Sequence, residues 1–166
     1  MTKVTLLLGC MAMVATAVAQ VGNQALPGSG LELQIVVETV VEVTGADGQP
    51  STELVPVAAP LPGDEIVYTV TFTNVNAQMA ENIRITNPIP AQVRYLADTA
   101  FGPGSEVLYS VDGGRTYGLP PELFVTAGDG SQRAAEAGDY THIRWVLKSP
   151  LDAGAKGFAR FRAVVR

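Results

Sequence analysis

The chain has 166 residues, of which 11 are Lys or Arg and 16 are Asp or Glu, so its formal net charge is −5 at pH 7. This length suits one domain with an interior large enough to be stable alone. The acidic balance argues against nucleic acid and anionic membrane surfaces as partners, because both bind basic patches.

Residues 1–19 have the layout of a secretory signal peptide. Lys3 precedes an apolar run from Val4 to about Val14, and the small residues Ala17-Val18-Ala19 form a cleavage site. The run is shorter than the about 20 apolar residues that a spanning helix needs. We therefore expect cleavage after Ala19 and export to the periplasm, the outer surface or the extracellular space. Lipoprotein processing at Cys10 is a weaker alternative, because the apolar region before it is too short.

The mature chain, residues 20–166, would lack cysteine, because Cys10 is the only one. It could therefore form no disulfide and bind no metal through a thiolate. Removal of Lys3 leaves 10 basic and 16 acidic residues, a net charge of −6. No apolar run after the signal is long enough to span a bilayer. We expect the protein to be released or held at the surface by protein contacts.

The N-terminal part of the mature chain divides into a leader and a hairpin. Residues 20–30 are small, polar and rich in glycine, which predicts a flexible leader. From Leu31 to Val43 apolar residues alternate with Glu and Gln, which predicts a strand with one buried face. Turn residues at 45–48 and the run 51–57 complete a leading hairpin over 31–57.

Period-two alternation continues to the C-terminus. It predicts strands within 62–74, 81–90, 105–111, 141–147 and 157–165, with Val93 and Tyr95 keeping the same period. No segment after Ala19 keeps a helical period for three turns, although 131–140 is compatible with a short helical turn. We therefore predict a single domain over 31–166, an all-β, antiparallel immunoglobulin-like sandwich of about seven to nine strands. The predicted core includes Tyr68, Val70, Phe72, Ile83, Ile85, Tyr95, Trp145 and Phe161.

Three blocks of the sequence resemble a known family. "PGDEIVYTVTFTN", "IRITNPIPAQVRYL" and "IRWVLKSPLDAGAKGFARFRAVV" are similar, in order and spacing, to a bacterial conserved-repeat family, domain of unknown function 11. The resemblance covers about residues 62–165 as a single copy, with the hairpin over 31–57 atypical of the family. It implies an immunoglobulin-like module of exported or cell-surface proteins, used as a spacer, adhesive or assembly unit, and it brings no catalytic residues.

The stretch "SVDGGRTY", residues 110–117, fits the Asp-box spacing familiar from sialidase-type propellers. Propellers repeat the box in several blades, whereas it occurs once in this chain. The residue types favour a hairpin turn, since Asp accepts backbone amides and glycine supplies unusual backbone angles. We predict a structural turn made by Ser110, Asp112, Gly113, Gly114 and Thr116.

Other residue types that carry chemistry have simpler explanations. His142 lies on the exposed side of the strand that holds Trp145, with no Ser or Asp placed by sequence to form a relay. Loop carboxylates are candidate calcium ligands, but they lack the D-x-D-x-D-G spacing, so turn chemistry is favoured. These carboxylates are Asp47, Asp112, Asp129, Asp139 and Asp152. We predict no catalytic residue, cofactor or metal.

Charge patterning suggests candidate assembly edges. The first strand presents Glu32, Glu38 and Glu42 outward, and the last presents Arg160 and Arg162. They are either solvated or cross-strand neighbours in one sheet, or they belong to opposite edges that pair between copies of the chain.

The favoured interpretation is an exported, non-enzymatic structural or interaction module whose partners are other surface proteins or copies of itself. The leader 20–30 could also donate a strand to a neighbour, although it does not alternate. The alternative is a secreted carbohydrate-binding or glycan-processing protein that uses the Asp-box region and the loop aromatics Tyr117 and Tyr140.

Overall fold

The structure, a computed structural model, describes residues 23–25, 30–44, 48–57 and 59–166. The predicted signal peptide, residues 1–19, lies outside the described residues, so its cleavage stays a prediction. The strands are β1 (Asn23–Ala25), β2 (Leu31–Thr44), β3 (Pro50–Pro56), β4 (Glu65–Asn74), β5 (Arg84–Pro88), β6 (Val93–Tyr95), β7 (Ser105–Ser110), β8 (Phe124–Thr126), β9 (Gln132–Ala134), β10 (His142–Leu147) and β11 (Lys156–Val165). Two 3-10 helices are η1 (Pro120–Glu122) and η2 (Ala137–Asp139).

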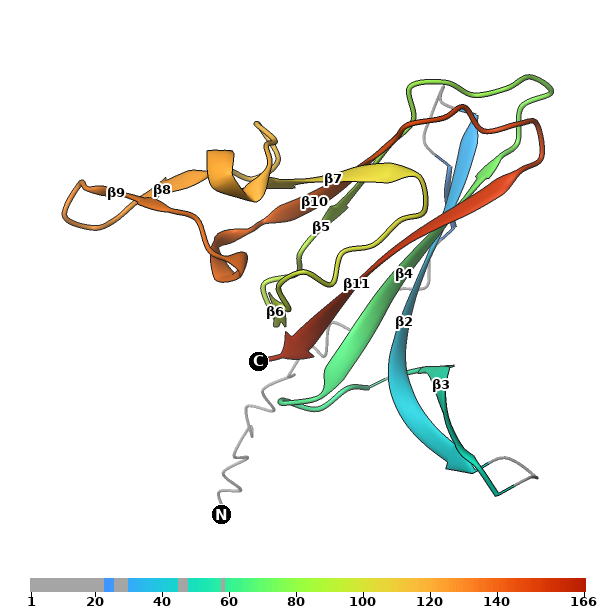
Figure 1. The fold of residues 1–166 in the computed structure, drawn as a ribbon, viewed down its shortest axis with the longest axis horizontal. Helices are drawn as coiled ribbons and strands as arrows, with labels where there is room; N and C mark the ends of the chain where they lie inside the picture. Colours follow the sequence, from blue (N-terminus) through green and yellow to red (C-terminus); the bar gives the residue numbers. More distant parts are fainter. Residues whose placement is uncertain (1–22, 26–29, 45–47, 58) are drawn as a thin grey trace, which may run out of the picture.

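The strands form two sheets that face each other, together with a separate hairpin (Figure 1). The large sheet has the order β1-β2-β4-β11-β6, with β3 also paired to β2. The small sheet has the order β5-β10-β7, and β8 pairs with β9. Every one of these pairs is antiparallel. The predicted all-β antiparallel sandwich is therefore confirmed.

The core lies between the inward faces of β4, β11 and the small sheet. Tyr68 lies opposite Phe161 in the β4–β11 register, and their rings stack with centroids 4.7 Å apart. Trp145 of β10, in the small sheet, packs against Phe161 of the large sheet, with ring centroids 6.4 Å apart. All the predicted core residues are buried: Tyr68, Val70, Phe72, Ile83, Ile85, Tyr95, Trp145 and Phe161.

The structure describes eleven strands, more than the seven to nine predicted. One of them, β1, lies in the predicted flexible leader 20–30 and pairs with β2, where Gln24 is opposite Leu33. The others are β8 and β9, and β9 lies with η2 in the segment 131–140 where only a helical turn was expected. The strands β8 and β9 are largely exposed, so they need no apolar alternation and leave no such pattern in the sequence.

The predicted leading hairpin over 31–57 is present as β2 and β3, with its turn residues 45–47 outside the described part. β4 pairs with β2 only from Leu31 to Glu38, and β3 pairs with β2 from Glu38 to Thr44. The distal half of this hairpin therefore extends past the sandwich, as Figure 1 shows. We call residues 39–44 and 50–56 the arm.

Among the residues that the structure describes, no helix is long and apolar enough to cross a membrane.

Candidate functional site

The Asp-box residues close the chain tightly after β7. Gly113 and Gly114 have φ angles of 77° and 84°, which glycine adopts without steric penalty. The Asp112 carboxylate accepts hydrogen bonds from the Arg115 amide at 3.0 Å, the Thr116 amide at 3.0 and 3.1 Å, and the Thr116 hydroxyl at 2.7 Å. The predicted turn residues therefore lie together, with Asp112 bonded directly to Thr116 and the two glycines supplying the positive φ angles.

The side chain of Ser110, at the end of β7, holds this turn through three hydrogen bonds. This side chain is fully buried, and its hydroxyl donates to Asp112 Oδ1 at 2.7 Å. The Ser110 hydroxyl oxygen also accepts hydrogen bonds from the Gly114 amide at 2.9 Å and from the Asp112 amide at 3.3 Å. The Ser110 hydroxyl is thus neither exposed nor free to attack a substrate.

These bonds change the acidity of the turn. Hydrogen bonds from the Thr116 amide and hydroxyl, and then from Ser110, hold the pKa of Asp112 well below its ordinary value. A general acid needs the opposite shift, because it must carry a proton near neutral pH. Asp112 is therefore a fixed anion that fastens the turn.

The turn is tied to the neighbouring strand through Thr141. Its hydroxyl accepts the Gly113 amide at 3.1 Å and donates to the Ser110 carbonyl at 3.1 Å. The third partner of this hydroxyl is His142, whose Nδ1 lies 3.1 Å from it. His142 is half-buried and bonds to Thr141, while the Ser110 hydroxyl bonds to Asp112. The bonds that the structure gives these residues form no Ser–His relay.

The two loop aromatics of the carbohydrate alternative, Tyr117 and Tyr140, are each covered on one face by a neighbouring side chain. The Arg144 guanidinium carbon lies 3.4 Å from the centre of the Tyr117 ring, and Arg144 Nε donates to Thr86 Oγ1 at 3.0 Å. Tyr140 stacks on Tyr109 with ring centroids 4.4 Å apart. Both Tyr117 and Tyr140 are half-buried rather than exposed.

The loop carboxylates bind their own turns. Asp129 accepts from the Ser131 amide and hydroxyl, which lowers its pKa. Asp139 forms a two-bond ion pair with Arg133, with both N to O distances 2.7 Å, and this pair also lowers its pKa. Asp47 lies outside the described residues. Within the described part of the chain, no group of three or more His, Cys, Asp or Glu could hold a metal ion.

Most of the residues proposed for assembly edges lie inside the large sheet, where β2 and β11 pair with β4. Both β2 and β11 flank β4 inside the large sheet, so their charged residues share one outer face. On that face Arg162 forms an ion pair with Glu65, and Glu38 accepts from Thr69 Oγ1 at 2.9 Å. Arg160 lies over the Phe158 ring. The remaining residues of the set, Glu32 and Glu42, lie at opposite ends of β2.

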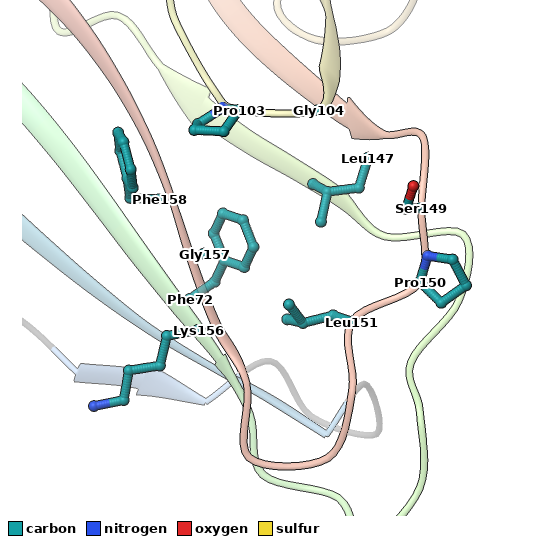
Figure 2. A pocket seen from close by; sticks show the side chains of 10 residues that line it. All are labelled: Phe72, Pro103, Gly104, Leu147, Ser149, Pro150, Leu151, Lys156, Gly157 and Phe158. Carbon is teal, nitrogen blue, oxygen red and sulfur yellow. The ribbon is translucent and has the colours of Figure 1, made fainter.

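Sequence reasoning missed an apolar groove of about 340 Å³ between the start of β11 and the end of β10 (Figure 2). The Phe72 ring forms its floor, with the side chains of Leu147 and Leu151 beside it. Gly157 lies directly over Phe72, where any Cβ would overlap the ring. The other lining residues are Pro103, Gly104, Ser149, Pro150, Lys156 and Phe158.

One wall of the groove is an unpaired strand edge. Arg160 exchanges two backbone hydrogen bonds of 2.8 Å with Phe101, on the side of β11 away from β4. Because backbone groups alternate along an antiparallel strand, those of Lys156 and Phe158 face the same side. Among the described residues they have no backbone partner there. We call Lys156 and Phe158 the open β11 edge.

Proline explains why this edge is open. If the antiparallel Phe101–Arg160 pairing continued by two residues on each strand, Pro103 would lie opposite Phe158. Proline has no amide hydrogen to donate and cannot continue a ladder. The segment before β7 therefore turns away and leaves the groove uncovered. The sequence signals were Pro103 and the small Gly157, but neither identifies a groove without the strand order.

No family model, curated protein or solved structure matches this chain. The resemblance to the conserved-repeat family therefore stays a prediction.

Proposed function

We propose that the protein is an exported, non-enzymatic structural or interaction module of the cell surface or extracellular space, which joins copies of itself or other surface proteins. Export rests on the signal-peptide layout of residues 1–19. The immunoglobulin-like family resemblance over residues 62–165 supports the same role.

The open β11 edge beside an apolar groove carries this proposal. Unpaired strand edges accept an additional extended segment, with main-chain hydrogen bonds giving affinity and side-chain pockets giving specificity. The groove supplies such a pocket, because Leu147 and Leu151 present apolar surface beside the buried Phe72 ring, next to Lys156 and Phe158. At about 340 Å³ it is at the small end of the range for small-molecule sites, about 300 to 1,000 Å³.

The Asp-box turn supports a non-enzymatic role. A glycosidase needs two carboxyl groups that act on the bond between two sugars. The two oxygens of Asp112 are already held by the Thr116 and Arg115 amides and by two hydroxyl groups. The covered faces of Tyr117 and Tyr140 also weaken the alternative of a carbohydrate-binding protein.

Peptide display on the mature chain, residues 20–166, tests the proposal. Random extended peptides should be selected by the protein, and Lys156→Pro should abolish their binding, because its amide faces the open side and is not needed by β4. Lys156→Ala is the matched control and should keep binding. The proposal fails if the protein selects no peptide and does not self-associate. Binding on a glycan array would instead favour the carbohydrate alternative.

A further inference from the structure

The arm has an open edge of its own. Val57 donates to the Val37 carbonyl at 3.0 Å, so the odd residues of β2 face β3 and the even residues face the β4 side. Beyond Glu38, β2 has no strand partner on the β4 side among the described residues. Val40 and Glu42 therefore lie along an edge without proline, and Val40 is 40% exposed.

The outer edge of β3 is less suited to pairing. It begins at Pro50 and ends at Pro56, neither of which can donate a backbone hydrogen bond. The even-numbered edge of β2 is therefore the side of the arm that can accept another strand.

We propose that the arm of one copy pairs antiparallel with the open β11 edge of a second copy, with Glu42 opposite Lys156 and Val40 opposite Phe158. This inference rests on the proposed function and names the partner as the chain itself. Both edges present their backbone groups at every second residue, so the Glu42–Lys156 and Val40–Phe158 pairs can both form backbone hydrogen bonds in the same register.

The side chains are complementary in this register. Directly opposed residues lie on the same face of a sheet, so the Glu42 carboxylate meets the Lys156 ammonium group and Val40 meets the Phe158 ring. Val41 would then lie opposite Gly157 and face the groove. Because Gly157 has no side chain, Val41 can contact the Phe72 ring that forms the floor.

Acidic and basic residues are unevenly distributed along the chain, and the distribution gives the arm and the groove opposite charges. Residues 20–83 contain eight acidic residues and no Lys or Arg, whereas residues 84–166 contain ten basic and eight acidic residues. The arm belongs to the acidic part, and the groove carries Lys156. Opposite charges favour the encounter of these two surfaces over contact between two arms.

The two surfaces lie at opposite ends of the large sheet. Figure 1 shows the arm extending past one end of this sheet and the connection between β10 and β11 at the other end. A copy that offers its arm therefore keeps its own groove free, and a copy that offers its groove keeps its arm free. Such a heterologous contact propagates head to tail and forms linear chains of molecules unless the rotation closes a ring.

Sedimentation velocity of residues 20–166 at increasing protein concentration tests this register. Wild-type protein should self-associate, and Glu42→Lys and Lys156→Glu should each weaken association about tenfold by opposing like charges in place of a pair. The double variant with both changes should recover wild-type association. Glu106→Lys and Arg115→Glu make the same charge changes at exposed positions outside the contact and should have no effect.

Mixing gives a second readout. Glu42→Lys protein and Lys156→Glu protein should associate with each other, because the reversed pair forms at one contact and the wild-type pair at the other. If the double variant does not recover, or if wild-type protein stays monomeric at every concentration, the arm is not the occupant. Peptide binding that Lys156→Pro abolishes would still support the proposed function in that case, so the two failures are distinguishable. Melting temperatures of all variants check that each is folded.

Discussion

Asn74, the last residue of β4, offers the sharpest test of what holds the end of the sandwich together. Its side chain is fully buried, and Nδ2 donates to the carbonyls of Gln78, Leu151 and Asp152 at 2.8, 2.9 and 3.1 Å. Its Oδ1 accepts the Asn76 amide at 3.0 Å. One side chain thus joins the loop after β4 to the connection between β10 and β11, next to the groove.

The expected loss on Asn74→Ala follows from these bonds. An amide has two N–H groups, so the three donated contacts amount to two hydrogen bonds, and the accepted one makes three. At about 1 kcal/mol for each net bond, the free energy of unfolding should fall by about 3 kcal/mol. The loss should not be larger, because Leu151 O keeps the Ala80 amide and Asp152 O keeps the Ala155 amide. For a domain of this size the melting temperature should fall by about 6 to 12 °C.

Asn74→Asp separates hydrogen bonding from shape. The carboxylate has almost the same size but cannot donate, and it faces three carbonyl oxygens, so at neutral pH this variant should be less stable than Asn74→Ala. Burial and the facing carbonyl oxygens disfavour the ionised carboxylate, whereas the protonated carboxyl group can donate one hydrogen bond to them. The pKa of this carboxyl group is therefore raised in the folded state. The cost of burying the ionised carboxylate should be full above that folded pKa and be relieved as the pH falls to about 4, the value for an unfolded Asp, which leaves the loss of one donated hydrogen bond.

Urea denaturation at pH 7 and pH 4 measures these effects. Gln78→Ala is the matched control, because it removes an exposed amide side chain from the same loop and keeps the backbone carbonyl that Asn74 binds. If both Asn74 variants unfold within about 0.5 kcal/mol of wild type, which is the range of a surface substitution, the reasoning is refuted.

Three further substitutions test the turn, the groove and the core. Asp112→Ala should lower the melting temperature by several degrees in calorimetry. The difference from wild type should shrink as the pH falls below about 4, because the hydrogen bonds that lower the pKa of Asp112 stabilise the folded protein only while this carboxylate is ionised. An unchanged melting temperature would contradict its role. Gly157→Ala should cost about 1 to 3 kcal/mol in urea denaturation by overlap with Phe72, and no loss would mean that the ring moves aside freely. Phe161→Ala should cost about 3 to 5 kcal/mol by the same measurement, and a loss below 1 kcal/mol would place the core elsewhere.

The sequence predicted the core well, because buried strands carry a strong signal. Period-two alternation identified the inward residues of β4 and β11, including Tyr68 and Phe161, and the structure buries both. The same signal is absent from β8 and β9, whose residues are largely exposed. Periodicity reports burial, so it misses strands that are held by backbone bonds alone.

The candidate sites divide in a similar way. The Asp-box turn was predictable, because the hydrogen bonds among its own residues join positions at most 4 apart and follow from local turn chemistry at Ser110 and Asp112. The charged residues of β2 and β11 stayed open between neighbours in one sheet and opposite edges, because a sequence does not state which strands are neighbours. Strand order is decided by contacts between distant segments, such as Trp145 against Phe161.

The part of the molecule best suited to bind a partner is the part that folding leaves unpaired. The most recognisable motif, the Asp-box, has its carboxylate and its serine hydroxyl engaged within its own turn. The groove contains no motif, since its features are a missing side chain at Gly157, a missing amide hydrogen at Pro103 and an open row of backbone groups. Buried and internal groups tend to be satisfied during folding, so unsatisfied backbone at a strand edge is a stronger argument for a partner than a cluster of polar side chains.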